Sequence, residues 1–318
     1  MTGLAFIFPG QGSQEIGMGK ALADAFPAAR AVFAEVDDAL GQNLSKLMWD
    51  GDIAELTLTA NTQPALMAHS VAAMRALEAA SGLSAANARF VAGHSLGEYS
   101  ALASAGAISL ADTARLLRIR GNAMQGAVAA GEGAMAALLG ADVAQAEAAC
   151  AAGRATGGVC EIANDNAPGQ LVLSGSKAAI DAACEHAKAN GVKKAMALNV
   201  SAPFHCSLMQ PAADAMAEAL SGVTISAPVV PVVANISAAP TSDPDTIRQN
   251  LVDQVTGRVR WTESVQFMVG QGVTSTAEAG AGKVLTVMQR RIEKSLNGFT
   301  LGTPEDIEAF AAVILQET

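Results

Sequence analysis

The sequence predicts an α/β fold, in which a mostly parallel sheet is covered by helices and carries a small inserted domain. Short apolar runs beside turn residues alternate with helical stretches along most of the chain, which is typical of a parallel sheet. The middle of the chain has a separate βαββαβ order, the ferredoxin-like order. Three glycines precede this middle segment and Ser201-Ala202-Pro203 follows it, so we interpret it as an insertion.

Four apolar runs outside the insertion have the length and the flanking turn residues of buried strands. They are Leu4 to Phe8, Phe90 to Ala92, Val229 to Ala234 and Val273 to Ala277. Helices are expected over Ala65 to Ala80 and Leu110 to Met124. Ser109 and Asp112 resemble a capping box at the start of the second of these, and a last helix is expected to begin at Pro304.

Strands and helices alternate within the insertion. The expected strands are Ala134 to Leu139, Val159 to Ala163, Gln170 to Ser174 and Lys194 to Val200, and the expected helices are Asp142 to Ala152 and Lys177 to Asn190. We therefore expect residues 129–200 to form a ferredoxin-like small domain. Residues 1–128 and 201–318 would then form one large, discontinuous domain.

Composition and charge exclude several classes of protein. Half of the 318 residues are apolar and 16% are charged, which indicates a packed globular enzyme. The formal charge of −10 argues against a nucleic-acid partner. The first apolar run is short, and prolines interrupt the apolar stretch from Ala227 to Ile236, so neither a secretory signal nor a membrane anchor is expected. Four scattered cysteines lack metal-ligand spacing, so we expect reduced thiols, no metal and a cytoplasmic location.

Residues 93–97 read Gly-His-Ser-Leu-Gly, the G-x-S-x-G pattern of a nucleophile elbow. An apolar strand precedes the pattern and a helical stretch follows it, as that turn requires. A sharp strand-to-helix turn needs small residues on both sides of the nucleophile, and Gly93 and Gly97 meet that need. Such a turn would present the Ser95 hydroxyl at a helix N-terminus, where the Leu96 N–H can stabilise an oxyanion.

A serine hydroxyl needs a base before it can act as a nucleophile, and the chain has four histidines. His69 and His186 are expected on helices, and His94 adjoins the serine on the turn and would point away from it. His205 lies in a loop after the insertion and downstream of the serine. We therefore favour His205 as the base.

The third member of a catalytic triad is harder to place. No Asp or Glu occupies an obvious loop between Ser95 and His205 after a strand of the large domain. Asp165 is the nearest candidate, but it lies within the predicted insertion. A neutral carbonyl could orient the imidazole instead, which favours a dyad over an ordinary hydrolase triad.

The glycine-rich segment after the first strand resembles a phosphate loop only superficially. Residues 9–14 read Pro-Gly-Gln-Gly-Ser-Gln and lack the Gly-Lys-Ser/Thr ending, so a nucleotide site is not expected. Glycines allow the backbone to pass close to a substrate carbonyl. We expect the Gln11 N–H to be a second oxyanion donor opposite the Leu96 N–H.

Arg120 is the most informative charged residue. On the expected helix it falls inside the apolar arc, between Leu116 and Met124, whereas Arg115 points away from that arc. A guanidinium turned inwards needs an anionic partner, because an unpaired buried charge is very costly. A structural ion pair and a bidentate clamp for a substrate carboxylate both remain open on this pattern.

Five motifs can be compared together with those of known families. They are Gly10-Gln11-Gly12-Ser13-Gln14, Gly93-His94-Ser95-Leu96-Gly97-Glu98-Tyr99-Ser100, Arg120-Gly121, Asn166-Ala167-Pro168-Gly169-Gln170 and Phe204-His205. In this order they closely resemble the malonyl-CoA:acyl carrier protein transacylases, which belong to the acyltransferase family of fatty acid and polyketide synthesis. The resemblance runs nearly end to end and implies an α/β-hydrolase-like large domain with a ferredoxin-like insert.

The same resemblance implies roles for the catalytic residues. Ser95 would be the nucleophile and His205 the base. The N–H groups of Gln11 and Leu96 would form the oxyanion hole. Gln254 matches the glutamine that orients the histidine in this family and would supply the neutral carbonyl.

The resemblance also implies how the substrate is held. Arg120 would bind the malonyl carboxylate, and Asn166 belongs to a motif near the cleft. Phe204 matches the residue found before the histidine in malonyl-selective synthase domains. One departure is the sequence Gly-Ala-Gly-Lys at residues 280–283, where the family often has Gly-Pro-Gly-Lys.

The activity implied by the resemblance is transfer of a malonyl group from malonyl-CoA to the phosphopantetheine thiol of acyl carrier protein. It would proceed by a ping-pong mechanism through a malonyl-serine intermediate, supply fatty acid synthesis and need no cofactor. Two other functions remain open. A serine thioesterase or hydrolase acting on acyl-CoA would use the same elbow, and a non-catalytic subunit would only bind the carrier protein.

Overall fold

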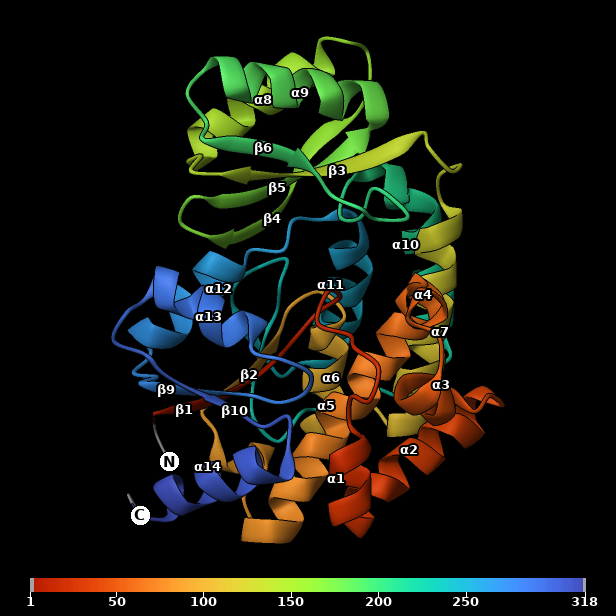
Figure 1. Cartoon of the computed structure of the whole chain (residues 1–318), viewed down its shortest axis with the longest axis vertical. Helices are drawn as coiled ribbons and strands as arrows, with labels where there is room; N and C mark the ends of the chain where they lie inside the picture. The colour runs from red at the N-terminus through yellow and green to blue at the C-terminus, as the bar shows by residue number, and fades with distance from the viewer. Residues whose placement is uncertain (1–2, 317–318) are drawn as a thin grey trace.

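The computed structural model describes residues 3–316 and contains two sheets, each covered by helices (Figure 1). The large sheet has the strand order β10-β9-β1-β2-β7-β8, with every neighbouring pair parallel except β7 and β8. Its strands are β1 (Leu4–Phe8), β2 (Phe90–Gly93), β7 (Val232–Val233), β8 (Pro240–Thr241), β9 (Ser275–Glu278) and β10 (Asn297–Thr300). The predicted mostly parallel sheet is therefore confirmed.

Helices pack on both faces of the large sheet, because side chains along the central strand alternate between two apolar cores. Leu4, Phe6 and Phe8 of β1 face one core, and Ala5 and Ile7 face the other. The helices of this part are α1 (Lys20–Ala25), α2 (Pro27–Leu40), α3 (Leu44–Asp50), α4 (Ile53–Thr57), α5 (Thr59–Ser81), α6 (Gly97–Ser104), α7 (Leu110–Gly126), α10 (Gln210–Ser221), α11 (Pro244–Thr256), α12 (Trp261–Gly270), α13 (Val284–Ile292) and α14 (Pro304–Gln316), with short 3₁₀ turns η1 (Ala85–Asn87) and η2 (Ser207–Met209). Helices α12 and α13 supply the second core, whereas α2, α5 and α7 supply the first.

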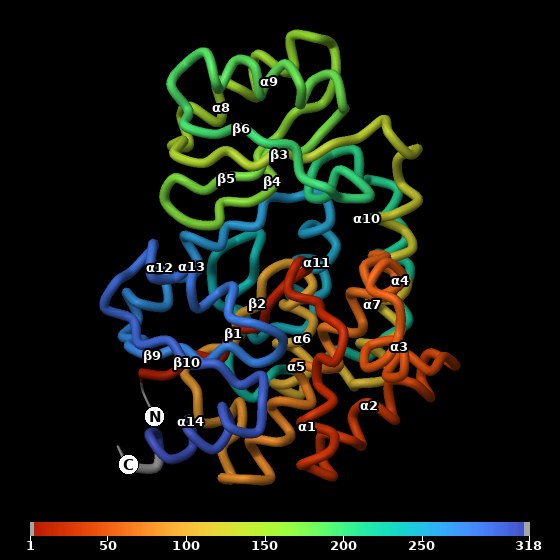
Figure 2. Tube along the Cα trace, in the orientation of Figure 1, coloured from red at the N-terminus to blue at the C-terminus, as the bar shows by residue number. Residues whose placement is uncertain are grey.

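The second sheet is antiparallel and has the strand order β4-β5-β3-β6, which is that of a ferredoxin-like fold. Its elements are β3 (Gly133–Leu139), α8 (Val143–Arg154), β4 (Cys160–Ala167), β5 (Gln170–Ser176), α9 (Lys177–Ala189) and β6 (Lys194–Ala197). They lie within the segment 129–200 expected to form the insert. Figure 2 follows the chain from α7 into this small domain and back from β6 towards α10.

Backbone hydrogen bonds join the small domain to the large one. The register of β4 shifts between Ile162 and Asn164, and there the strand pairs with the segment before α12. The Val259 N–H donates to the Ala163 carbonyl at 2.8 Å, and the Asp165 N–H donates to the Val259 carbonyl at 2.9 Å. The small sheet is thereby fixed above the carboxyl ends of the large sheet, with Met135 and Val172 directed into the core of the large domain.

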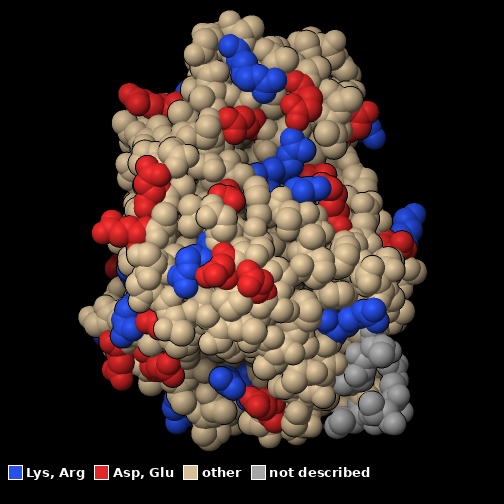
Figure 3. Space-filling model, turned by 180° about the vertical axis from the view of Figure 1, so that it is seen from behind, with Lys and Arg blue, Asp and Glu red and all other residues tan. Residues whose placement is uncertain are grey.

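Four elements differ from the sequence prediction by three residues or more at one end. Strand β4 continues to Ala167, beyond the expected Ala163, and strand β6 ends at Ala197, short of the expected Val200. The strand expected over Val229 to Ala234 pairs only at Val232–Val233, because Pro231 has no N–H to donate to a neighbouring strand. The helix expected from Ala65 begins at Thr59, since Pro64 is accommodated within α5. No helix of residues 3–316 has the length and apolar character needed to cross a bilayer. Acidic and basic side chains are interspersed between wide uncharged areas on the face seen from behind in Figure 3.

Candidate active site

The turn between β2 and α6 has the geometry of a nucleophile elbow. Ser95 adopts a φ of 53°, a left-handed conformation that a non-glycine residue rarely adopts. A Cβ at Gly93 would lie 2.0 Å from the Gly97 carbonyl carbon, and one at Gly97 would lie 2.2 Å from the Phe8 carbonyl oxygen. Both positions therefore require glycine, as the sequence pattern predicts.

The serine hydroxyl and one imidazole are in direct contact. Ser95 Oγ lies 2.7 Å from Nε2 of His205, and Nδ1 of His205 lies 2.8 Å from the backbone carbonyl of Gln254. A carbonyl can only accept, so Nδ1 carries the proton and Nε2 is free to accept one from the serine. Burial, with a smaller contribution from the charge of Arg120, lowers the pKa of His205 to about 3. The imidazole is therefore a neutral base at neutral pH.

Gln254 contributes two separate groups to the site. Its backbone carbonyl accepts from His205 Nδ1 and so orients the imidazole, which is the role that the dyad hypothesis gives to a neutral carbonyl. Its side-chain Nε2 donates to the Ser95 carbonyl at 3.1 Å, and its Oε1 accepts from Arg120 Nη2 at 2.9 Å. Asp165 has a different role, because its carboxylate accepts from the Thr262 hydroxyl at 2.7 Å.

Arg120 is turned into the protein and is 1% exposed. Its Nη1 donates to Gln63 Oε1 at 2.9 Å, and its Nη2 donates to Ser95 Oγ at 3.2 Å. Among the described residues no carboxylate forms an ion pair with it, and its Nε has no hydrogen-bond partner. Gly121 allows α7 to pack closely on the start of α5, because a Cβ there would lie 2.7 Å from Ala60 Cα. This contact brings Gln63 to the guanidinium.

A cavity of about 280 Å³ lies above the elbow, between the large domain and the small sheet. Seven of the predicted site residues line it: Gln11, Ser95, Leu96, Arg120, Asn166, Phe204 and His205. The eighth, Gln254, is fully buried behind them. Met135, Asn164 and Val172 of the small sheet complete the wall. Within residues 3–316, no group of three or more His, Cys, Asp or Glu side chains could hold a metal ion.

The two predicted oxyanion donors come from different loops, Gln11 from the loop after β1 and Leu96 from the elbow, and both line this cavity. Neither the Gln11 N–H nor the Leu96 N–H donates to an acceptor among the described residues, so both are available to a ligand. His94 turns away from Ser95, as expected, and its Nε2 lies 2.8 Å from Asn166 Oδ1. Asn166 thus orders the outer side of the turn.

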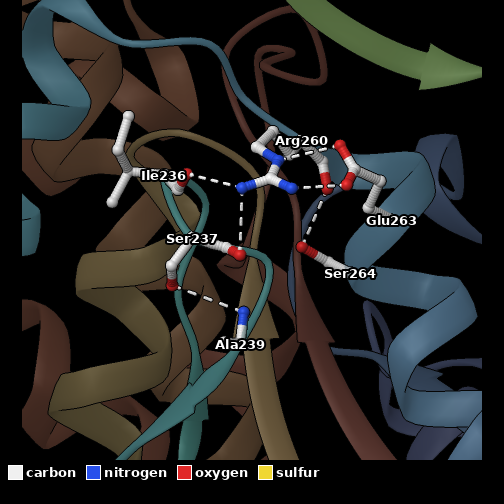
Figure 4. Close-up of polar contacts among 6 residues, drawn as sticks. All are labelled: Ile236, Ser237, Ala239, Arg260, Glu263 and Ser264. Carbon is white, nitrogen blue, oxygen red and sulfur yellow. Dashed lines mark hydrogen bonds and ion pairs between the residues drawn. The ribbon is translucent and has the colours of Figure 1, made fainter.

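Asn235 is a site residue that the sequence analysis missed. Its Oδ1 accepts from the Ser95 N–H at 2.7 Å, and its Nδ2 donates to the Gly93 carbonyl at 2.7 Å. Arg260 holds the loop that follows Asn235, because its Nη1 donates to the carbonyls of Ile236 and Ser237 while Glu263 binds its other nitrogens (Figure 4). The available signal was the position of Asn235 directly after an apolar strand, where ligand-binding residues of parallel sheets gather.

Glu98 is a second missed residue, and it lies within the quoted elbow motif. Its side chain is 2% exposed, and its Oε2 accepts from the Asn235 N–H and from Gln254 Nε2, both at 2.9 Å. Burial raises the pKa of Glu98 to about 7, although both hydrogen bonds and the charge of Arg120 oppose that shift. Gln63 is the third missed residue, because an amide inside an apolar helix gives no periodic signal.

The chain is similar to known proteins over nearly its whole length. Residues 5–298 match the family described as "Acyl transferase domain". The malonyl CoA-acyl carrier protein transacylase of Bacillus subtilis (strain 168) is 43% identical over 317 residues, covering 100% of this chain and 99% of the relative. The protein of the same name from Escherichia coli (strain K12) is 46% identical over 309 residues, covering 97% and 99%.

Solved structures agree with these relatives. The acyl-carrier-protein-S-malonyltransferase of Bartonella henselae is 56% identical, has a TM-score of 0.95 and covers 98% of this chain and 99% of that one. A malonyl-transacylase solved in complex with a type II PKS acyl-carrier protein is 41% identical, with a TM-score of 0.94 and coverage of 98% and 99%. The likeness thus extends over nearly the whole chain, including both sheets.

Proposed function

Since this chain belongs to the acyl transferase domain family, we propose that it transfers a malonyl group from malonyl-CoA to the phosphopantetheine thiol of acyl carrier protein. The malonyl group is carried on Ser95 between the two half-reactions, and the product supplies fatty acid synthesis. The observation that carries the proposal is Arg120, a buried guanidinium 3.2 Å from the serine hydroxyl with only neutral partners. A free acyl carboxylate is the anion that this position lacks.

The first half-reaction forms the ester. Ser95 Oγ attacks the thioester carbonyl while His205 Nε2 takes the hydroxyl proton, and the N–H groups of Gln11 and Leu96 bind the resulting oxyanion. The C–S bond then breaks, and the coenzyme A thiolate takes the proton from His205. Malonyl-Ser95 and free coenzyme A remain.

The second half-reaction runs the same steps in reverse. The phosphopantetheine thiol gives its proton to His205 and attacks the ester carbonyl. The C–O bond to Ser95 breaks, and His205 returns the proton to the serine oxygen. Arg120 holds the malonyl carboxylate through both halves, so one binding contact serves donor and acceptor.

We place this reaction in the cytoplasm. Cys150, Cys160, Cys184 and Cys206 are all free thiols, which supports a reducing compartment.

Intact-mass measurement tests the proposal. Malonyl-CoA alone should add one malonyl group to the wild-type chain, and Ser95→Ala should remain unmodified. Ser100→Ala is the matched control, since Ser100 lies on α6 just after the elbow, is fully buried, and its hydroxyl has no hydrogen-bond partner within residues 3–316. Label on the Ser95→Ala variant would refute the nucleophile, and rapid loss of the ester in water without a thiol acceptor would favour the hydrolase alternative.

A further inference from the structure

Glu98 is a buried carboxylate close to the reacting groups that the proposed mechanism does not use. It lies in the first turn of α6, and among the described residues no Lys or Arg forms an ion pair with it. Its two hydrogen bonds go to the Asn235 backbone and to the Gln254 amide. A buried carboxylate without a direct cation is costly to keep, and an apolar residue of this size would fill the space at a lower cost.

The hydrogen bonds around the Gln254 side chain admit one orientation of its amide. Arg120 can only donate, so the amide oxygen must face it. The Ser95 carbonyl and the Glu98 carboxylate accept, so the amide nitrogen must face them. A flipped amide would place its nitrogen against the guanidinium and its oxygen against two acceptors, and all three contacts would be lost.

Glu98 therefore influences Arg120 through a single amide group. The Glu98 carboxyl group lies one side chain away from the guanidinium, on the far side of the Gln254 amide, and does not occupy the hydrogen-bonding edge of Arg120. A carboxylate in direct contact would form a closed ion pair and compete with a ligand. The intervening amide leaves the guanidinium available for one more anion.

We propose that Glu98 is a positioning residue that fixes the orientation of the Gln254 amide. The fixed amide in turn holds the Arg120 guanidinium beside the Ser95 hydroxyl, where it can bind the acyl carboxylate. This inference rests on the proposed function, since it assigns Glu98 to the selectivity of the same site. It predicts that Glu98 matters for acyl groups that carry a free carboxylate. For acyl groups without one, it is only a buried side chain.

The test compares malonyl and acetyl transfer in five proteins: wild type, Glu98→Ala, Glu98→Gln, Arg120→Ala and the double variant Glu98→Ala with Arg120→Ala. Glu98→Ala should lower the malonyl-to-acetyl ratio of kcat/KM about tenfold, mainly through a higher KM for malonyl-CoA. Glu98→Gln keeps an acceptor oxygen for both partners and should restore the ratio to within about threefold of wild type. In the Arg120→Ala background, removing Glu98 should change the ratio less than about twofold, because the two residues act as one unit.

Glu278→Ala is the matched control. Glu278 is also fully buried, but it accepts from the N–H groups of Leu285 and Thr286 at the start of α13, away from the cavity. Its loss should lower the thermal unfolding temperature and affect malonyl and acetyl transfer equally. A Glu98→Ala variant that behaves in the same way would overturn the positioning role, as would a Glu98→Gln variant that loses selectivity as fully as Glu98→Ala.

The two proposals fail in different ways. A wild-type chain that forms no malonyl ester would refute the proposed function itself. If the wild-type chain forms the ester and Arg120→Ala loses the selectivity for malonyl, but Glu98→Ala keeps it, only the role of Glu98 is refuted.

Discussion

Replacing Arg120 with alanine should change selectivity between acyl groups far more than it changes catalysis in general. The substitution removes a guanidinium that is 1% exposed and leaves the side-chain oxygens of Gln63 and Gln254 without their donor. It also removes a contact to Ser95 Oγ. These losses affect every substrate, whereas the lost cation affects only a substrate with a carboxylate.

The size of the effect follows from the burial of the pair. Removing one member of a desolvated ion pair costs roughly 3 kcal/mol or more, because the other charge is left without a partner. At about 1.4 kcal/mol for each factor of ten, malonyl transfer should fall by about two powers of ten or more relative to acetyl transfer. Acetyl transfer should fall much less, or rise, since the methyl end of an acetyl group makes no ion pair with the guanidinium.

The assay measures kcat/KM for transfer of each acyl group from coenzyme A to carrier protein. The ratio of the two values cancels damage common to both substrates. Arg115→Ala is the matched control, because Arg115 lies on the same helix but pairs with Asp112 on the surface, and its loss should leave the ratio unchanged. Equal losses for malonyl and acetyl in Arg120→Ala would show that Arg120 is structural.

Three further predictions concern pH and the backbone of the elbow. Because the pKa of His205 is lowered to about 3, the rate at which phenylmethanesulfonyl fluoride modifies Ser95 should stay constant from pH 8 to about 5. The rate should fall only as the imidazole protonates near its pKa, and an inflection near pH 6.5 would contradict this. Burial lowers the pKa of His69 to about 4, so the folded state binds fewer protons than the unfolded state between that value and about 6.5, and stability is lost as the pH falls through this range. His69→Gln should therefore reduce the loss of unfolding free energy between pH 7 and 5 by about 2 kcal/mol, measured by urea titration, and an unchanged pH dependence would refute that assignment. Gly93→Ala should lower the free energy of unfolding by more than about 2 kcal/mol and abolish ester formation, because the added Cβ would overlap the Gly97 backbone. The control is Gly126→Ala, whose Cβ would have no atom within 4 Å, and this variant should unfold at the same or a higher temperature. A folded, active Gly93→Ala enzyme would refute the steric argument.

The fold could be predicted to the extent that local patterns determine it. The spacing of apolar residues and the turn residues that flank them locate β1 and most of the insert. The βαββαβ order then indicates how the strands of the insert are arranged. The limits of β7 depend on which backbone N–H groups find a partner, and Pro231 decides this only once the sheet is assembled. The two-residue length of β7 therefore cannot be predicted from a local pattern.

The site divides in the same way. Ser95 lies in a motif whose glycines report the turn directly, and Arg120 is found because an inward charge interrupts an apolar face. Gln63 reaches the site from α5 through a hydrogen bond to Arg120, and Asn235 reaches it from the loop after β7 through hydrogen bonds to the Ser95 N–H and the Gly93 carbonyl. Their amides are ordinary polar residues in sequence, and only the packing of α5 on α7 and of the loop after β7 gives them a partner.

The order of the strands has a consequence for how the chain is made. β1 lies in the middle of the large sheet and pairs with β2 on one side and with β9, residues 275–278, on the other. When about two hundred residues have left the ribosome, the chain contains Ser95 but neither His205 nor β9, the strand that pairs with the second edge of β1. A nascent chain at that stage lacks the base of the proposed mechanism and exposes an apolar strand edge on which other chains can pair. Strand β9 pairs with that edge, and α12 and α13 cover the face of β1 that carries Ala5 and Ile7, only near the end of synthesis. The yield of folded protein should therefore depend on chaperones that shield the first strand until then.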